Sequence, residues 1–223
     1  MLKNSLLSEK QNELINYLIE KSNHSRRELP PINQISQDLG ISTANLREQM
    51  ELLKIIGVVS AKPRKGLQLL EYRFTPAVLK SLYYAVRLNY QYFSQFSEIR
   101  NHLEKSFFIE SVKSLNKQDI YQLEACVSQA KAKMSGDPIQ IPHLEHRNFH
   151  LAIYSHIGNV FLTGILEAYW DTYELVGLHV YTDLVYLEKV WTYHQMIVDE
   201  INVKKYHRAY ELLIEHMELI YTR

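Results

Sequence analysis

Hydrophobic residues recur every three or four positions through most of the chain, a spacing that predicts amphipathic helices. The first such stretch, SEKQNELINYLIEK, places Leu14, Tyr17 and Leu18 on one face, with Ser8 before them as a favourable N-cap. The polar segment HSRRELPP follows and contains two prolines. The sequence therefore predicts one helix that ends before this segment.

Two short helical patterns come next, and a glycine separates them. In INQISQDLG, Gly40 is suited to close the first helix. In ISTANLREQMELLKIIG, Ser42 is a good N-cap and the pattern ends at Gly57. Two short helices joined by a tight glycine-containing turn are typical of a helix-turn-helix. The apolar faces of the two patterns are formed by Ile32, Ile35 and Leu39, and by Leu46, Met50 and Leu53.

The segment VVSAKPRKGLQLLEY has the pattern of two short strands on either side of KPRKG. It predicts a β-hairpin whose tip carries Lys62, Arg64, Lys65 and Gly66. A helix, a helix-turn-helix and a basic hairpin in this order predict a winged helix-turn-helix domain over residues 1–72.

The remainder of the chain, residues 73–223, begins with the linker EYRFTP and is helical in pattern throughout. We expect a mostly α protein in which the winged helix precedes an all-α bundle of six or seven helices. The predicted helices cover residues 77–95, 97–114, 117–134, 142–157, 160–177, 184–201 and 204–221, with the first two either separate or continuous.

The composition agrees with a helical globular protein, because 46% of the 223 residues are hydrophobic and only 7 are glycine and 6 proline. The single cysteine, Cys126, cannot form a disulfide within the chain, which favours a reducing compartment. No apolar run reaches the roughly 18 residues of a membrane helix, and the first residues are too polar for a signal peptide. We expect a soluble, cytoplasmic protein with no membrane partner.

The charges are balanced overall, which excludes a protein that is basic over its whole surface. Residues 1–75 carry 11 Lys and Arg against 8 Asp and Glu, a mild excess that alone indicates no partner. The expected recognition helix is a more specific indication of a DNA partner than the charge balance, because in a winged helix this helix enters the DNA major groove. Its first turn exposes Thr43, Ala44 and then Arg47, and an arginine there can bind a guanine edge. A solvated helix and a basic turn without a ligand remain the alternative.

The N-terminal segment resembles the DNA-binding domain of GntR-type bacterial transcription regulators. The matching residues are Leu29, Pro30, Leu39, Gly40, Ser42, Arg47, Glu48, Gly57 and Gly66. Three positions where the family carries a basic residue depart from it, since they hold Asn33, Thr43 and Glu51. Fewer charges imply weaker phosphate affinity or a changed operator. The resemblance and the pattern together give the DNA-binding candidates Asn33, Ser42, Thr43, Asn45, Arg47, Lys62, Arg64, Lys65 and Gly66.

Histidines gather in the second part of the chain, where nine of the ten lie after residue 100. His146 and His150 are four residues apart and therefore share a helix face. Two imidazoles are rarely enough for a metal, and His194 and His216 are candidates for the missing ligands. Residues alone leave open that all four are ordinary core histidines.

The second part also resembles the FCD domain, the all-helical effector domain of one branch of GntR-type regulators. The resemblance rests on Phe149-His150, Gly158-Asn159, His194 and a last histidine, His216, 22 residues further on. Ala209 and the helix with Arg100, Leu103 and Glu104 also match the family pattern.

The FCD resemblance implies a divalent metal held by one aspartate and three histidines, with a small carboxylate effector that completes the coordination. His150, His194 and His216 take the histidine positions, and His146 stands at the aspartate position. Glu145 is a poor substitute, because it lies about 140° round the helix from His150. Four imidazoles suit Zn²⁺ or Ni²⁺. They are neutral, however, so we expect an increased demand for an anionic ligand.

Arg100 is the residue expected to face that anion, with an intrahelical ion pair to Glu104 as an equal alternative. Tyr154, Asn159 and Tyr193 are further candidates for contact with the effector, from their positions alone. His156 is expected at the surface, and His143 has no assigned role.

Three classes of function follow. The first is a ligand-responsive regulator that binds double-stranded operator DNA as a homodimer. The second is a metalloenzyme, against which stands the lack of a placed general base such as that of HExxH. The third is an interaction module with a degenerate winged helix, which the three lost basic residues leave open. The first class is the expected one, with no enzymatic activity.

Overall fold

The computed structural model describes residues 9–22, 27–176 and 183–219 of the 223-residue chain. The chain divides into two compact units, Met1–Lys80 and Ser81–Arg223. The predicted N-cap Ser8 lies outside the described residues.

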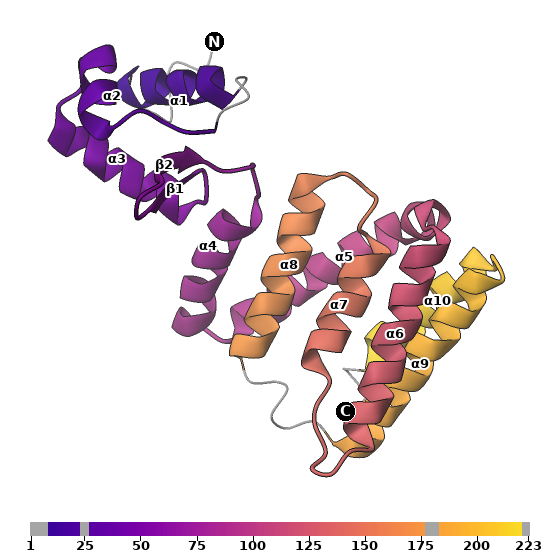
Figure 1. Ribbon diagram of the computed structural model, residues 1–223. Coiled ribbons are helices and arrows are strands. Elements are labelled where there is room, and N and C mark those ends of the chain that lie inside the picture. The colour runs from indigo at the N-terminus through magenta and orange to yellow at the C-terminus, as the bar shows by residue number, and fades with distance from the viewer. Residues whose placement is uncertain (1–8, 23–26, 177–182, 220–223) are drawn as a thin grey trace. The chain divides into compact units, whose positions relative to one another are not determined.

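The first unit contains the predicted helix-turn-helix and hairpin (Figure 1). Its helices are α1 (Glu9–Ser22), α2 (Ile32–Leu39) and α3 (Thr43–Ile55), and its strands are β1 (Val59–Lys62) and β2 (Gly66–Leu69). Gly40 ends α2 in a left-handed conformation with φ of 62°, and the Ser42 side chain accepts a hydrogen bond from the backbone N–H of Asn45. The local signals of the sequence are therefore the ones that shape this turn.

The hairpin is antiparallel, with Val59 opposite Leu69 and Lys62 opposite Gly66. The segment before α2 pairs with its outer side, since the backbone N–H of Leu29 donates to Leu67 O at 2.9 Å. Gly57 cannot be replaced by a larger residue without a shift, because a Cβ there would lie 2.6 Å from Pro76 Cγ and φ is +78°. The buried core of this unit consists of Leu14, Leu18, Leu29, Ile35, Ile41, Leu46, Met50, Val59 and Leu69.

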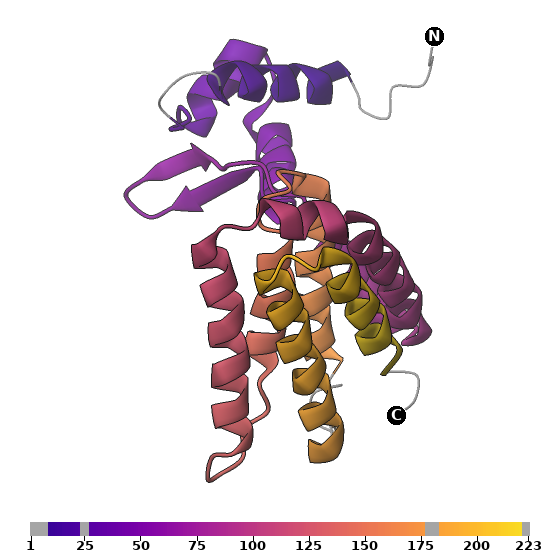
Figure 2. The same cartoon turned by 90° about the vertical axis from the view of Figure 1, so that its right-hand side faces the viewer.

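The rest of the described chain is helical, which confirms the predicted fold class (Figures 1 and 2). α4 spans Thr75–Leu88 across the boundary between the units. The helices that follow are α5 (Gln91–Ser114), α6 (Lys117–Met134), α7 (His143–Ile153), α8 (Val160–Leu175), α9 (Leu184–Asn202) and α10 (Tyr206–Glu218).

Two predicted helix boundaries are wrong. The break expected after residue 95 lies at Asn89, whose side chain accepts a hydrogen bond from the backbone N–H of Gln91 and so starts α5 early. The histidine-bearing helix ends at Ile153 rather than 157. The N–H groups of Tyr154 and Ser155 turn to carbonyls three residues back, which tightens and ends the helix.

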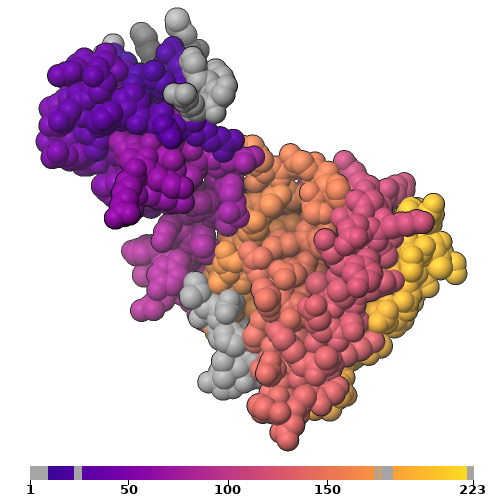
Figure 3. Space-filling model, in the orientation of Figure 1, coloured from indigo at the N-terminus to yellow at the C-terminus, as the bar shows by residue number. Residues whose placement is uncertain are grey.

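In the second unit α9 packs against α10 and α6, α6 packs against α7, and α5 contacts α7, α8 and α10. On the face seen in Figure 3, the side chains of α6, α7 and α8 close the space between these helices. The large buried side chains include Phe108, Leu123, Phe149, Ile153, Leu166, Trp191 and Ile197. Among the described residues, no helix combines the length and apolarity needed to span a bilayer.

Candidate functional site

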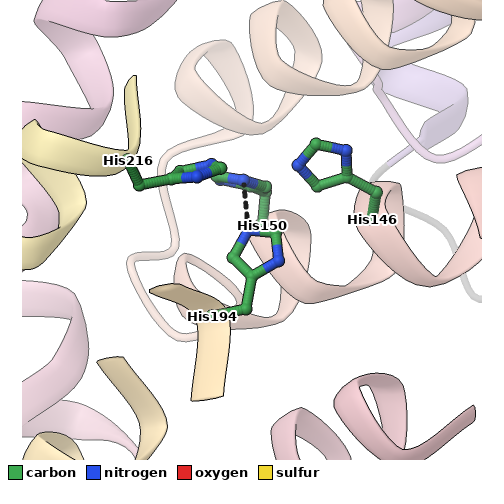
Figure 4. Close-up of side chains that lie close together, drawn as sticks. All are labelled: His146, His150, His194 and His216. Carbon is green, nitrogen blue, oxygen red and sulfur yellow. Dashed lines mark hydrogen bonds between the residues drawn. The ribbon is translucent and has the colours of Figure 1, made fainter. Parts of the chain in front are cut away.

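Four histidine side chains from three helices converge inside the second unit (Figure 4). His146 and His150 come from successive turns of α7, His194 comes from α9 and His216 from α10. One ring nitrogen of each lies within 4.8 Å of those of the other three. His150, His194 and His216 are buried and His146 is half-buried. The structure thus brings together the four histidines that the sequence singled out.

The donor set fits a divalent transition metal. Nε2 of His150 and Nε2 of His194 are 3.4 Å apart. Two nitrogens bound to one tetrahedral Zn²⁺ at about 2.0–2.1 Å are separated by about 3.3–3.4 Å. Nε2 of His146 is buried and has no hydrogen-bond partner, although such donors and acceptors are normally paired. Four imidazole ligands suit Zn²⁺ and Ni²⁺, so the residues present agree with either ion.

A buried ion pair lies directly behind His150. Glu104, fully buried on α5, accepts a hydrogen bond from Arg100 Nη2 at 2.8 Å. Its Oε2 is also 3.1 Å from Nδ1 of His150, and Arg100 Nη2 is 2.9 Å from the same nitrogen. When Nε2 of a histidine binds a metal, Nδ1 carries the hydrogen and donates it to an outer acceptor, here the Glu104 carboxylate. Glu104 therefore orients His150 and brings a negative charge close to the cluster.

Glu104 does not compensate the charge of an ion held by four neutral imidazoles. Its carboxylate is 3.1 Å from Nδ1 of His150, but it is paired with Arg100 at 2.8 Å, so the two side chains carry no net charge. The increased demand for an anionic ligand stays a prediction. For Arg100, one of the two alternatives left open by the sequence is confirmed, since it pairs with Glu104 at i, i+4. Arg100 also lines a cavity beside the histidines, and its contact with an effector anion stays a prediction.

Burial keeps the imidazoles neutral. It lowers the pKa of His146, His150, His194 and His216 well below the usual 6.5, and neighbouring groups add to the effect. For His150 the additional cause is the Arg100 guanidinium, and for His194 it is the other imidazoles and then Arg100. Burial also lowers the pKa of Arg100, but Glu104 together with Tyr169 and Tyr154 raises it overall. Neutral histidines are the form that binds metals.

A cavity of about 350 Å³ adjoins the cluster and is formed by α5, α7, α8, α9 and α10 together with the residue before α5. Arg100, His146 and His216 lie at its wall. The guanidinium of Arg100 stacks 4.9 Å from the ring centre of Tyr169 and 5.1 Å from that of Trp170. The full lining comprises Tyr90, Phe93, Ser94, Ser97, Glu98, Arg100, Asn101, His146, Tyr169, Trp170, Tyr173, Tyr186, His216 and Met217.

The other three effector candidates are absent from this lining. The Tyr154 hydroxyl donates to the backbone oxygen of Glu104 at 3.0 Å, and the Asn159 side chain accepts from Phe161 N and Leu162 N at the start of α8. Tyr193 is half-buried on α9 and interacts with Glu215. The Gly158-Asn159 pair has a structural role, because Gly158 turns the chain with φ of +66° and Asn159 caps the next helix.

The remaining residues singled out near the cluster lie apart from it. Glu145 is buried against Lys133 of α6, with 2.7 Å between its Oε1 and Nζ. His156 is exposed as predicted, and its Nε2 is 2.8 Å from Asp119. His143 is the first residue of α7 and is no member of the four-histidine cluster.

In the winged-helix unit, the DNA-binding candidates lie on the surface. Asn33, Ser42, Asn45, Arg47, Lys62, Arg64, Lys65 and Gly66 are exposed, and Thr43 is half-buried. Arg64 and Gly66 both have positive φ at the hairpin tip, which gives the basic turn its tight curvature. Asn45 accepts a hydrogen bond from the buried side chain of Gln49, one turn further along α3.

The sequence reasoning missed the aromatic wall of the cavity. Phe93, Tyr169, Trp170, Tyr173 and Tyr186 come from α5, α8 and α9, and none was considered for a site. The only sequence signal is the run YWDTY in α8, which has the same apolar pattern as an ordinary buried helix.

Fold and site together define a class of protein in which a winged helix-turn-helix unit precedes an all-helical unit with a buried histidine cluster. The FCD domain matches residues 95–219, and the chain belongs to the FCD domain family. The predicted resemblance to GntR-type regulators with an FCD domain is thereby confirmed.

Solved structures share this fold over nearly the whole chain. The GntR protein of Streptococcus agalactiae has 18% identity and a TM-score of 0.67, over 95% of this chain and 96% of that one. E. coli McbR/YncC has 20% identity and a TM-score of 0.51, with 97% of each chain covered. Lar, which controls expression of the agr system of Listeria monocytogenes, has 16% identity and a TM-score of 0.50, over 97% and 96%. No curated protein matches the chain significantly.

Proposed function

We propose that this chain is a ligand-responsive transcription regulator. Its winged helix binds operator DNA, and its helical unit binds a divalent metal and a small carboxylate effector. The observation that carries the proposal is the four-histidine cluster next to the Arg100-lined cavity, within an FCD domain that follows a winged helix.

The surface of the winged helix supports DNA binding. Arg47 is exposed on α3, the helix expected to enter the major groove, and the hairpin tip offers Lys62, Arg64 and Lys65 for phosphates. A homodimer would present two such surfaces to a pseudo-palindromic operator. We propose this dimer as the functional form, with the effector favouring one arrangement of its two reading units over the other.

In the helical unit, His146, His150, His194 and His216 would hold the ion, Zn²⁺ or Ni²⁺. A bound ion would supply positive charge at the cavity wall, where an anionic ligand can complete its coordination. Arg100 would bind and orient the same anion, since its guanidinium lines the cavity and is held in place by Glu104 and by two aromatic rings.

The direct test uses the full chain and a DNA fragment from upstream of its own gene in a gel-shift titration. We expect a shift that an unrelated fragment of equal length competes for poorly, and that weakens steeply between 50 and 200 mM salt, values at which roughly 10³-fold changes are typical. Binding equally weak to both fragments would contradict the regulator and favour an interaction module.

Arg47→Ala should weaken specific DNA binding by about 5- to 150-fold, the equivalent of about 1–3 kcal/mol, and relax base preference at one position. The reason is the loss of a two-pronged contact to a base edge. Fluorescence anisotropy with labelled operator measures the change. Lys10→Ala is the control, because it removes one exposed positive charge from α1, away from the recognition helix. Equal effects of the two substitutions would exclude base reading by Arg47.

Glu104→Gln should lower metal affinity by about 10- to 100-fold, the usual cost of losing an outer partner of a metal-binding histidine. The substitution keeps the shape of the side chain but removes the charge next to His150. Competition with a metal-sensitive dye measures the affinity, and circular dichroism confirms the fold. Glu110→Gln, at an exposed position on the same helix, is the matched control. An unchanged affinity would show that Glu104 serves only to pair Arg100.

A further inference from the structure

The cavity beside the histidines has an aromatic wall. Six of its 14 lining residues are phenylalanine, tyrosine or tryptophan. Phe93, Tyr169 and Trp170 are buried, Tyr173 and Tyr186 are half-buried, and Tyr90 is exposed. The aromatic surface therefore runs from the buried end of the cavity, next to Arg100, to its exposed rim.

These rings are packed against one another as a continuous surface. Phe93 stacks on Tyr169 with 5.4 Å between ring centres, Tyr169 meets Trp170 edge-on at 5.1 Å, and Trp170 lies 5.5 Å from Tyr173. Such a wall offers faces and edges to a flat ring, and aromatic contacts are favourable beyond the area that they bury. The 350 Å³ volume lies at the small end of the range for ligand pockets, which excludes a large body.

The charged side chains at the cavity indicate how many carboxylates a ligand can carry. Among the described lining residues, Arg100 is the one cation and Glu98 the one carboxylate. Arg100 lies buried at the inner end and is paired with Glu104, but its Nε has no hydrogen-bond partner, so a charged N–H donor remains for a ligand carboxylate. Glu98 is exposed at the rim, where it repels a second carboxylate further out along the ligand.

We infer that the effector is a small monocarboxylate with a flat aromatic body. Its carboxylate faces Arg100 and the histidine cluster, and its ring lies against Tyr169, Trp170 and Tyr173. This inference rests on the proposed function for the existence of an effector. It excludes citrate-like polycarboxylates, and it ranks aromatic acids above aliphatic ones of the same size.

Calorimetric titration of the full-length, zinc-loaded protein with four probes tests the inference. Benzoate and cyclohexanecarboxylate have the same ring size but differ in flatness, terephthalate adds a second carboxylate at the far end of the benzoate ring, and citrate carries three. We expect benzoate to bind about 2- to 10-fold more tightly than cyclohexanecarboxylate, the range that aromatic contacts add. Terephthalate and citrate should bind more weakly than benzoate. Tighter binding of cyclohexanecarboxylate, terephthalate or citrate, or no binding of benzoate, overturns the inference.

Two variants locate the effect. Glu98→Gln should raise the affinity for terephthalate relative to that for benzoate, whereas Glu110→Gln, exposed elsewhere on α5, should change neither. Tyr173→Leu should abolish the preference for benzoate over cyclohexanecarboxylate while both still bind. If the two glutamine variants behave alike, or Tyr173→Leu keeps the preference, the ring and the second carboxylate are not read by this wall and the inference fails.

The same probes in the gel-shift titration separate this inference from the proposed function. If benzoate binds but leaves operator affinity unchanged, the aromatic monocarboxylate site stands and ligand-responsive regulation fails. If citrate changes operator affinity and benzoate does not, the regulator stands and the inference fails.

Discussion

His194→Gln combined with His216→Gln should abolish metal binding, while the wild type purified without chelator or immobilised nickel carries about one divalent ion per chain. The variant removes the ligands from α9 and α10 and leaves two imidazoles on α7, too few for a stable site. The affinity should fall by more than about 100-fold, since the loss of an outer partner alone costs up to that much. Metal analysis by mass spectrometry and dye competition measure the change.

Glutamine is chosen because both positions are buried and alanine would leave cavities in the core. The matched control is His156→Gln with His207→Gln, which removes two exposed histidines from the same unit. It should bind metal as the wild type does. The proposed metal site would be contradicted if the wild type and the variant were both free of metal, or if the variant kept its ion.

The same pair of variants has a signature in thermal stability. A ligand that binds only the folded state stabilises it by about 2.7 kcal/mol at 100 times its dissociation constant. Zinc should therefore raise the melting temperature of the wild type and of the surface control, and leave that of the His194 and His216 variant unchanged.

Much of the fold could be predicted because its determinants are local. Gly40 and Ser42 lie two positions apart and shape the turn of the helix-turn-helix, and the basic hairpin tip lies between two short strands. The start of α5 was predicted at the wrong residue because no such local signal precedes it. No glycine or proline marks the break at Asn89, where one side-chain hydrogen bond decides the boundary.

The candidate site was only partly predictable. Histidine spacing on one helix and the family pattern identified the four residues that the structure brings together. The outer groups depend on which helix faces which. Glu104 and His150 are 46 positions apart and meet only because α5 packs against α7. A buried carboxylate on one helix cannot be assigned to a ring on another from the spacing within either.

Position in the chain alone was a poor guide to the role of Asn159. Asn159 follows Gly158 in a pattern shared with the family, but its side chain is used to cap α8. The aromatic wall could not be predicted, because its residues resemble ordinary core residues in the sequence. Tyr169, Trp170 and Tyr173 have the spacing of a core helix, and only the packing of α5 and α8 leaves a cavity in front of them.

Without metal, the helical unit should lose stability steeply below pH 6.5. In the unfolded chain each imidazole takes up a proton near its usual pKa of about 6.5. In the folded unit, burial lowers the pKa of His146, His150, His194 and His216 well below that value. Below pH 6.5 the unfolded state therefore binds more protons than the folded state, and stability falls until the pH reaches the lowered pKa values.

The expected loss is about 1.4 kcal/mol per pH unit for each of the four imidazoles, or roughly 5–6 kcal/mol per unit together. Glu104 opposes it by at most one proton, because burial raises the pKa of that carboxyl group. Since domains are stable by about 5–15 kcal/mol, one to a few pH units are enough to unfold the metal-free unit. Above pH 6.5 these groups should leave stability unchanged.

Denaturant titrations in chelator at pH 7.5, 6.5 and 5.5 measure this slope. The fluorescence of Trp170 and Trp191 is a direct signal, because both rings lie within 6 Å of a ring of the cluster. Replacing both His194 and His216 with glutamine should reduce the loss per pH unit to about half, since His146 and His150 remain of the four imidazoles. The variant with His156 and His207 replaced should keep the full loss. Equal stability at pH 7.5 and 5.5 would mean that the imidazoles take up protons in the folded unit as they do in the unfolded chain, and would contradict the lowered pKa values.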